Sequence, residues 1–143
     1  MILFLDASAF VKLYVVEPGS GLFRRALKQA TAVFAIDTTY VEVRGALARA
    51  VASGMLRETV VRQANSDFER DWQGVHAVVP DSAMLRRAAD LAETGPIDTL
   101  GALNLSAAEA IARQLPAGSG FAVGTGDPER SELAARLGLQ RVE

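Results

Sequence analysis

The chain contains no cysteine and a single histidine, His76, among its 143 residues. The lack of cysteine excludes disulfide bonds and thiolate metal sites, and it is consistent with a reducing cytoplasm. Catalytic triads and histidine-rich zinc sites need imidazoles that this chain does not have. His76 lies in the apolar run 75–79, which is more typical of a strand residue than of a catalyst. Carboxylate chemistry, with or without a hard metal ion, is what remains.

Long hydrophobic runs and an excess of positive charge are also missing. No apolar stretch reaches the length of a membrane span, so we expect no membrane association. The apolar N-terminus is too short for a signal-peptide core and has no basic flank, which predicts that it belongs to the fold of a cytoplasmic protein. The formal net charge of −2 argues against a large electrostatic nucleic-acid footprint. It leaves room for a small site in which a divalent cation neutralises acids.

Strand-like and helix-like segments alternate along the chain. The predicted strands cover residues 2–5, 32–36, 75–79, 120–124 and 139–142. The predicted helices cover residues 7–16, 21–30, 39–53, 57–72, 82–94, 99–115 and 128–137. This alternation predicts a parallel sheet with helices on both faces. Because no linker, repeat or low-complexity tract divides the chain, we predict a single α/β domain over residues 1–143.

Acidic residues follow the predicted strands or open the predicted helices. Asp6 follows the first strand and Asp127 the fourth, while Asp98 and Glu42 lie at the starts of helices. In a parallel sheet these positions gather at one edge, where ligands bind. Taken singly, each Asp is explained more simply as a helix N-cap. Taken together, several acids without His or Cys are the donor set that binds Mg²⁺ or Mn²⁺.

Three stretches of the sequence resemble the motifs of PIN-domain proteins, above all the toxin ribonucleases of the VapC type. They are LDASAFVKLY at 5–14, TTYVEV at 38–43 and VGTGD at 123–127. Their order and spacing match over essentially the whole chain. The resemblance implies a PIN-like three-layer α/β/α fold with a five-stranded parallel sheet. It also implies a metal-dependent endoribonuclease that hydrolyses RNA phosphodiesters as the toxin of a type II toxin–antitoxin pair.

The resemblance assigns roles to individual residues and implies partners. Asp6, Glu42 and Asp127 match three acidic positions of the family, which together hold Mg²⁺ or Mn²⁺. Ser8 and Thr125 match hydroxyl residues that support these acids. The implied partners are an RNA substrate, a small antitoxin protein and a second copy of the chain in a homodimer.

A fourth acidic position of the family is not acidic in this chain. Where the family usually reads Leu-Asp-Ala-Leu-His-Leu-Ala, residues 100–106 read LGALNLS, so that Gly101 replaces the acid and Asn104 the common histidine. Either Asp98, about one helical turn earlier, supplies the missing oxygen, or the site is degenerate. The alternatives to an active ribonuclease are a PIN-like binding module that acts through protein or RNA contacts and, ranked last, an aspartyl phosphotransferase that uses Asp6.

Basic and apolar surfaces for partners are only weakly indicated. The residues that we consider for positioning RNA are Lys12, Arg24, Arg25, Arg44 and Arg49. A solvated helix surface explains each of them as well. The moderately apolar helices at 21–30 and 57–72 are candidates for contact with a partner, although both could equally cover the core.

Overall fold

The structure, a computed structural model, describes residues Met1–Glu143 and contains one parallel sheet. Its strands are β1 (Ile2–Leu5), β2 (Ala32–Ile36), β3 (Val75–Val78) and β4 (Phe121–Gly124). They lie in the order β3-β2-β1-β4, and β1 pairs with β4 from Ile2 opposite Phe121 to Leu5 opposite Gly124. Short apolar runs form these strands because the central ones are covered on both faces. The predicted α/β class with a parallel sheet is confirmed.

Seven helices connect and flank the strands. They are α1 (Ala7–Tyr14), α2 (Ser20–Gln29), α3 (Thr39–Ala52), α4 (Glu58–Trp72), α5 (Ser82–Thr94), α6 (Thr99–Gln114) and α7 (Pro128–Arg136). Every predicted helix is present, with bounds that differ from the prediction by two residues at most. None of them is long and apolar enough to cross a membrane.

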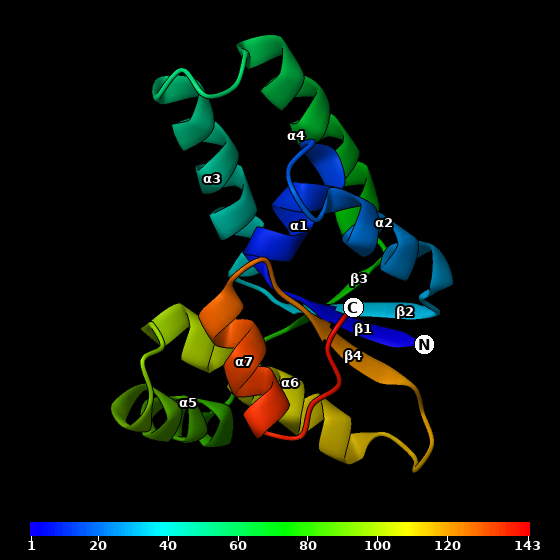
Figure 1. The fold of residues 1–143 in the computed structure, drawn as a ribbon, viewed down its shortest axis with the longest axis vertical. Coiled ribbons are helices and arrows are strands. Elements are labelled where there is room, and N and C mark those ends of the chain that lie inside the picture. The colour runs from blue at the N-terminus through cyan, green and yellow to red at the C-terminus, as the bar shows by residue number, and fades with distance from the viewer.

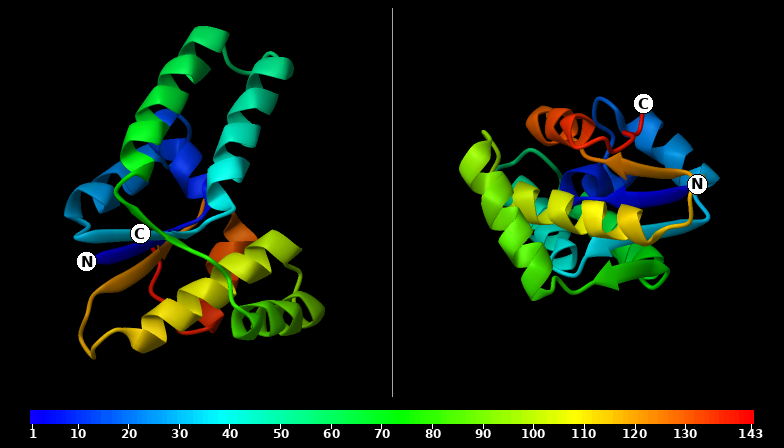
Figure 2. Two further views of the ribbon diagram at one scale, coloured as in Figure 1. Left: turned by 180° about the vertical axis from the view of Figure 1, so that it is seen from behind. Right: turned by 90° about the horizontal axis from the view of Figure 1, so that it is seen from below.

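The helices form a layer on each face of the sheet (Figure 1). Alternate residues of β1 point to opposite faces. Leu3 and Leu5 are therefore buried in the cluster that packs under α1–α4, while Phe4 is buried in the cluster with α5–α7. Viewed from below, α6 lies across the sheet with α5 beside it (Figure 2, right). The arrangement is a helix–sheet–helix sandwich.

The prediction of a fifth strand at 139–142 is wrong. This segment makes a single parallel bridge, between Arg141 and Val123, and forms no ladder. The cause lies at the end of α7, where Gly138 has φ +75°. There the N–H of Leu139 donates to the carbonyl of Ala134 at 3.0 Å, which is the helix-closing bond of a Schellman motif. Because its first N–H closes the helix, the segment meets β4 at one residue only.

Helices α3 and α4 form a pair that projects from the sheet (Figure 2, left). At the base of this pair Phe68 is fully buried, and its ring lies edge-on to Phe10 and Tyr14 at centroid distances of 5.9 Å and 5.8 Å. Tyr40 of α3 packs on the same ring at 5.7 Å. Such aromatic contacts add to the gain from burial. They fix α3, the helix that carries Glu42, against α1.

The first strand lies at the point where the chain reverses its direction across the sheet. From β1 the chain goes to β2 and β3 on one side and then returns to β4 on the other. In open α/β sheets the crevice at the carboxyl ends of the strands, at such a switch point, is where ligands bind. Asp6 directly follows β1, so the fold puts this carboxylate at the switch point.

We predict that Gly138→Ala lowers the free energy of unfolding by about 1 kcal/mol, because a Cβ is disfavoured at positive φ. A Cβ at this position would meet no atom within 4 Å, so the effect comes from the backbone conformation alone. Urea denaturation followed by circular dichroism measures it. Gly74→Ala is the matched control, since a Cβ there would make only an ordinary contact of 3.5 Å with the carbonyl of Asp71. Equal effects of the two substitutions would contradict this explanation of how α7 ends.

Candidate acidic site at the carboxyl ends of the strands

Asp6 is a buried carboxylate with four hydrogen-bond donors. Its Oδ1 accepts from Ser8 Oγ at 2.6 Å and from the N–H of Ala9 at 3.0 Å. Its Oδ2 accepts from Thr125 Oγ1 at 2.6 Å and from Arg130 Nη1 at 2.9 Å. Only 2% of the residue is exposed, so an unpaired charge here would be very costly. These four donors supply the partners that a buried, ionised carboxylate needs.

The two hydroxyl groups that donate to Asp6 also accept from backbone N–H groups in the loop between β4 and α7. Ser8 Oγ accepts from the N–H of Gly126 at 2.7 Å, and Thr125 Oγ1 accepts from the N–H of Asp127 at 3.1 Å. The start of α1 is thereby tied to the loop between β4 and α7. The structure places Ser8 and Thr125 on Asp6, at the positions that the motif resemblance suggested for supporting hydroxyls.

Each of the three aspartates also caps a helix. Asp6 caps α1, Asp98 caps α6 by accepting from the N–H of Gly101 at 3.0 Å, and Asp127 caps α7. For α7 the acceptor is Asp127 Oδ1, which lies 2.8 Å from the N–H of Glu129. A cap occupies one carboxylate oxygen with backbone donors. The capping interpretation is therefore confirmed, and it leaves the second oxygen of each carboxylate for other partners.

These second oxygens meet at the guanidinium of Arg130, in the first turn of α7. Nη1 lies 2.9 Å from Asp6 Oδ2, and Nη2 lies 2.9 Å from Asp98 Oδ2 and 3.1 Å from Asp98 Oδ1. Nε lies 3.8 Å from Asp127 Oδ2. Only 12% of the Arg130 side chain is exposed. One cation of the chain itself thus links three carboxylates of the candidate site.

The electrostatic environment keeps Arg130 charged, although one of its N–H groups has no hydrogen-bond acceptor. Burial opposes the charge, yet the carboxylates of Asp6 and Asp98 raise the pKa of Arg130 above its ordinary value. The Nε atom is buried without a hydrogen-bond acceptor. A buried donor left without a partner costs about 1–3 kcal/mol. The guanidinium is held by charge more than by complete hydrogen bonding.

Glu42 lies at the edge of the same cluster. It is half-buried near the start of α3, and its Oε1 accepts from Thr38 Oγ1 at 3.2 Å. Burial raises the pKa of Glu42, the Thr38 hydroxyl and the charge of Arg130 lower it, and the charges of Asp6 and Asp98 raise it further. The charges of Arg130, Asp6 and Asp98 therefore act on the pKa of Glu42, although Glu42 forms no ion pair itself.

Gly101 lies where the guanidinium and Asp98 come together. A Cβ at this position would lie 2.5 Å from Asp98 Oδ1 and 2.7 Å from Arg130 Nε. Both distances are shorter than real Cβ contacts, so these side chains fill the space that a larger residue would take. Asn104, one turn later, is buried and donates to the carbonyl of Leu100 at 2.9 Å.

The chemistry of the candidate ligands suits a metal ion, but their arrangement in the structure does not. Oxygen donors alone are what Mg²⁺ and Mn²⁺ prefer, and the candidate ligands supply only carboxylates. In the structure, however, no three or more Asp, Glu, His or Cys side chains are arranged to hold a metal ion. Three of the four acids are bound to Arg130 or face it instead. The donor chemistry fits a divalent ion, whereas the present arrangement of these side chains does not.

Arg130 is the functional candidate that sequence reasoning missed. It lies three residues after Asp127, on the first turn of α7. A positive charge at a helix N-terminus opposes the helix dipole and is disfavoured unless acids neutralise it. This unfavourable position of a positive charge is the feature of the sequence that singles out Arg130. It could indicate that Arg130 needs acidic partners, but not which strands bring them.

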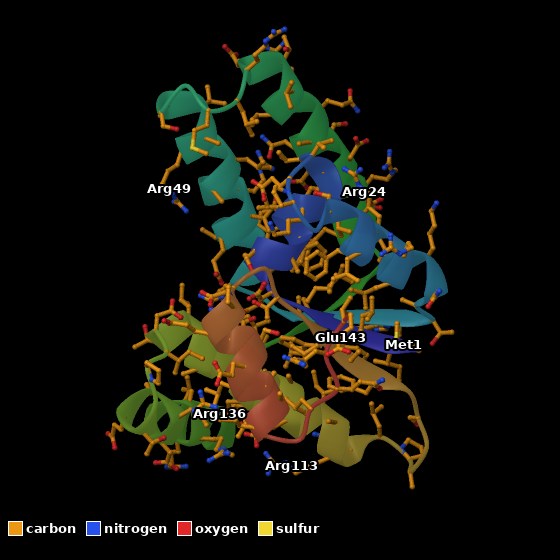
Figure 3. All side chains as sticks on the ribbon, viewed as in Figure 1. Met1, Arg24, Arg49, Arg113, Arg136 and Glu143 are labelled. Carbon is orange, nitrogen blue, oxygen red and sulfur yellow. The ribbon has the colours of Figure 1, made fainter.

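The basic residues considered for RNA binding are mostly engaged elsewhere. Lys12 pairs with Glu17 at 3.1 Å, Arg24 donates to the carbonyl of Leu13 at 3.1 Å, and Arg44 pairs with Glu69. Arg25 and Arg49 are exposed. Arg24 and Arg49 lie over α2 and α3, on the upper side of the sheet and away from α7 (Figure 3). None of these five side chains pairs with an acid of the candidate site.

Comparison with known proteins identifies relatives of the chain. No protein-family model matches it. Ribonuclease VapC45 and ribonuclease VapC49, from two strains of Mycobacterium tuberculosis, are each 32% identical to it over 110 residues. In both cases the match covers 77% of this chain and 76% of the relative.

Solved structures share the fold at low sequence identity. The crystal structure of Mycobacterium tuberculosis VapC20, a toxin that cleaves the sarcin-ricin loop, has a TM-score of 0.67 and 13% identity, over 92% of this chain and 94% of that one. FitAcB from Neisseria gonorrhoeae has a TM-score of 0.65 and 16% identity, over 100% and 97%. These likenesses show the fold, and the curated relatives show the family. The chain belongs to the VapC ribonucleases.

Proposed function

We propose that this protein is a divalent-metal-dependent endoribonuclease and the toxin of a toxin–antitoxin pair. The observation that carries the proposal is the meeting of motif acids from distant parts of the chain at one edge of the sheet. Asp6 and Asp127 follow the neighbouring strands β1 and β4 and both face Arg130. Glu42 lies in the first turn of α3 beside them, and the charge of Asp6 contributes to the raised pKa of Glu42. The membership in a ribonuclease family supports the reaction class.

We propose Asp6, Glu42 and Asp127 as the ligands of Mg²⁺ or Mn²⁺, with Asp98 as a further acid near them. A bound divalent ion would supply positive charge that stabilises the charge developing on the phosphoryl oxygen during hydrolysis. Ser8 and Thr125 keep the Asp6 carboxylate in one orientation through bonds of 2.6 Å. Thr38 orients Glu42. Such outer contacts reduce the reorganisation that a ligand needs on binding.

The partners are proposed from the family and from the surface. We propose an RNA substrate, a small antitoxin and a homodimer, with residues 1–143 acting as one domain in the cytoplasm. Phe23 of α2 and Phe68 of α4 are buried in the core, so the apolar faces of these helices mainly cover the core. The two most exposed large apolar side chains are Val16 and Met55, at 84% and 78% exposure. They border a groove between α1 and α3, which is the better candidate surface for the antitoxin.

We predict that the protein cleaves RNA in the presence of Mn²⁺ and that Glu42→Gln lowers the rate about 100-fold, because it removes a ligand charge. The amide oxygen can still accept from Thr38, so the fold should persist. Cleavage of a labelled RNA, with EDTA as a blank, measures the effect. Asp37→Asn is the matched control: Asp37 lies at the same sheet edge, is exposed and accepts only from the N–H of Thr38. Full activity of Glu42→Gln would contradict the ligand assignment.

A second candidate function is a catalytically degenerate PIN-like binding module, and the placement of Arg130 on Asp6 favours it. The substitution Gly101→Asp separates the two candidates, because it restores the family acid and its Cβ would displace Arg130 Nε. For the ribonuclease we expect EDTA-sensitive cleavage by the natural protein, lost in Asp6→Asn. Cleavage that appears only in Gly101→Asp would instead assign the binding module.

A further inference from the structure

We propose that Arg130 is the resident cation of the acidic site and that a divalent ion binds there only after the guanidinium has left Asp6. The proposal rests on the proposed function for the existence of an ion site. It adds that this chain carries its own competitor for the ion. In this view metal loading is an exchange of one cation for another.

The position of the guanidinium is the first argument. Nη1 donates to Asp6 Oδ2 at 2.9 Å, and Nη2 binds both oxygens of Asp98. Asp6 Oδ1 already accepts from the N–H of Ala9, which caps α1, and from Ser8 Oγ. Oδ2, which accepts from Thr125 Oγ1, is therefore the oxygen that an ion would use. An ion and the guanidinium therefore compete for the same oxygen atom.

The space around the guanidinium is the second argument. Arg130 Nε would lie 2.7 Å from a Cβ at position 101, so the guanidinium fits only because residue 101 is glycine. The same position lacks the acid that would add negative charge for an ion. The glycine thus makes room for the arginine and weakens the attraction for a metal ion at once. These two effects act in the same direction.

The incomplete hydrogen bonding of Arg130 is the third argument. Its Nε has no acceptor, and Asp98, which binds Nη2, has a side chain that is 57% exposed. Water can replace the contact with Asp98 at little cost. The guanidinium can therefore move outward while α7 stays in place, because Asp127 caps this helix through backbone N–H groups.

The competition has a measurable size. When the binding-competent form of a protein is a fraction of the total, its apparent Kd rises by the inverse of that fraction. If Arg130 occupies the site for about 90–99% of the time, the ion binds about 10- to 100-fold more weakly than to the open site. Removal of the guanidinium should lower the apparent Kd for the ion by this factor.

The test measures Mn²⁺ binding to the full chain without RNA, by the loss of the electron paramagnetic resonance signal of free Mn²⁺. Arg130→Met keeps an unbranched side chain and removes the charge. We expect it to lower the Kd for Mn²⁺ by about tenfold or more. Arg136→Met is the matched control on the same helix, because Arg136 pairs only with the exposed Glu132 at 2.9 Å. We expect it to leave the Kd unchanged within about twofold.

A second variant keeps the test decisive if Arg130→Met does not fold without metal. Gly101→Ala adds a Cβ that would lie 2.5 Å from Asp98 Oδ1 and 2.7 Å from Arg130 Nε, so it should displace the guanidinium from Asp98 and Asp6 while keeping its charge. We expect tighter Mn²⁺ binding than in the natural protein. We also expect a larger rise of Tm on addition of Mn²⁺ to this variant, because ligand binding stabilises the folded state.

The outcomes separate this proposal from the proposed function. Mn²⁺ binding that is equal in the natural protein, Arg130→Met and Gly101→Ala would overturn the competition while supporting the ion site. An absence of Mn²⁺ binding in all three proteins would overturn both. Tighter binding in either variant with an unchanged Arg136→Met supports the competition, whether or not RNA is cleaved.

Discussion

The candidate site depends on the need to neutralise one buried carboxylate. Asp6 follows a strand that is covered on both faces, where water cannot solvate an ionised side chain. Four donors from three separate parts of the chain satisfy it: the first turn of α1, the loop after β4 and the first turn of α7. Because a buried charge tolerates little loss of its partners, these segments are held in a fixed relation. The same contacts that stabilise the fold therefore shape the site.

The chemical character of the site depends on which cation neutralises Asp6. In this chain the cation is Arg130, and the glycine at position 101 gives it room. The site lacks the acid that the family pattern has at the position of Gly101, and it contains the positive charge of Arg130. A divalent ion would thus meet a weaker field than four acids provide. Family membership argues for a ribonuclease, while the local charge balance argues that its metal site is not preformed.

The sheet shows how a local closing motif can override a strand prediction. Residues 139–142 have the composition of a strand, and the sequence indicates a fifth strand there. The turn at Gly138 uses the N–H of Leu139 to end α7, and only one bridge to β4 remains. Asp6, Asp127 and Arg130 all follow the carboxyl ends of β1 and β4, and none of them belongs to residues 139–142.

Much of this protein could be predicted from its sequence, for physical reasons. Helices and strands are local patterns of apolar residues, so the sequence predicts the bounds of all seven helices and of the four strands to within two residues. Asp6, Asp98 and Asp127 were recognised as caps because capping depends on neighbours in the chain. The positions of the acids after strands and at helix starts also predict that Asp6, Glu42 and Asp127 gather at one edge of the sheet, and the structure brings Asp6 and Asp127 to the same arginine, Arg130.

The tertiary structure alone decided which cation those acids face. Asp6 and Arg130 are separated by 124 positions in the sequence, and they meet only because β4 pairs beside β1 and delivers α7 to the end of that strand. No local pattern encodes such a contact, and the charge of Arg130 at a helix start merely indicated that acids must be near. Asp6 was determined by the sequence as a carboxylate in need of a partner. The fold determined that the partner is an arginine, because the space at Gly101 admits one.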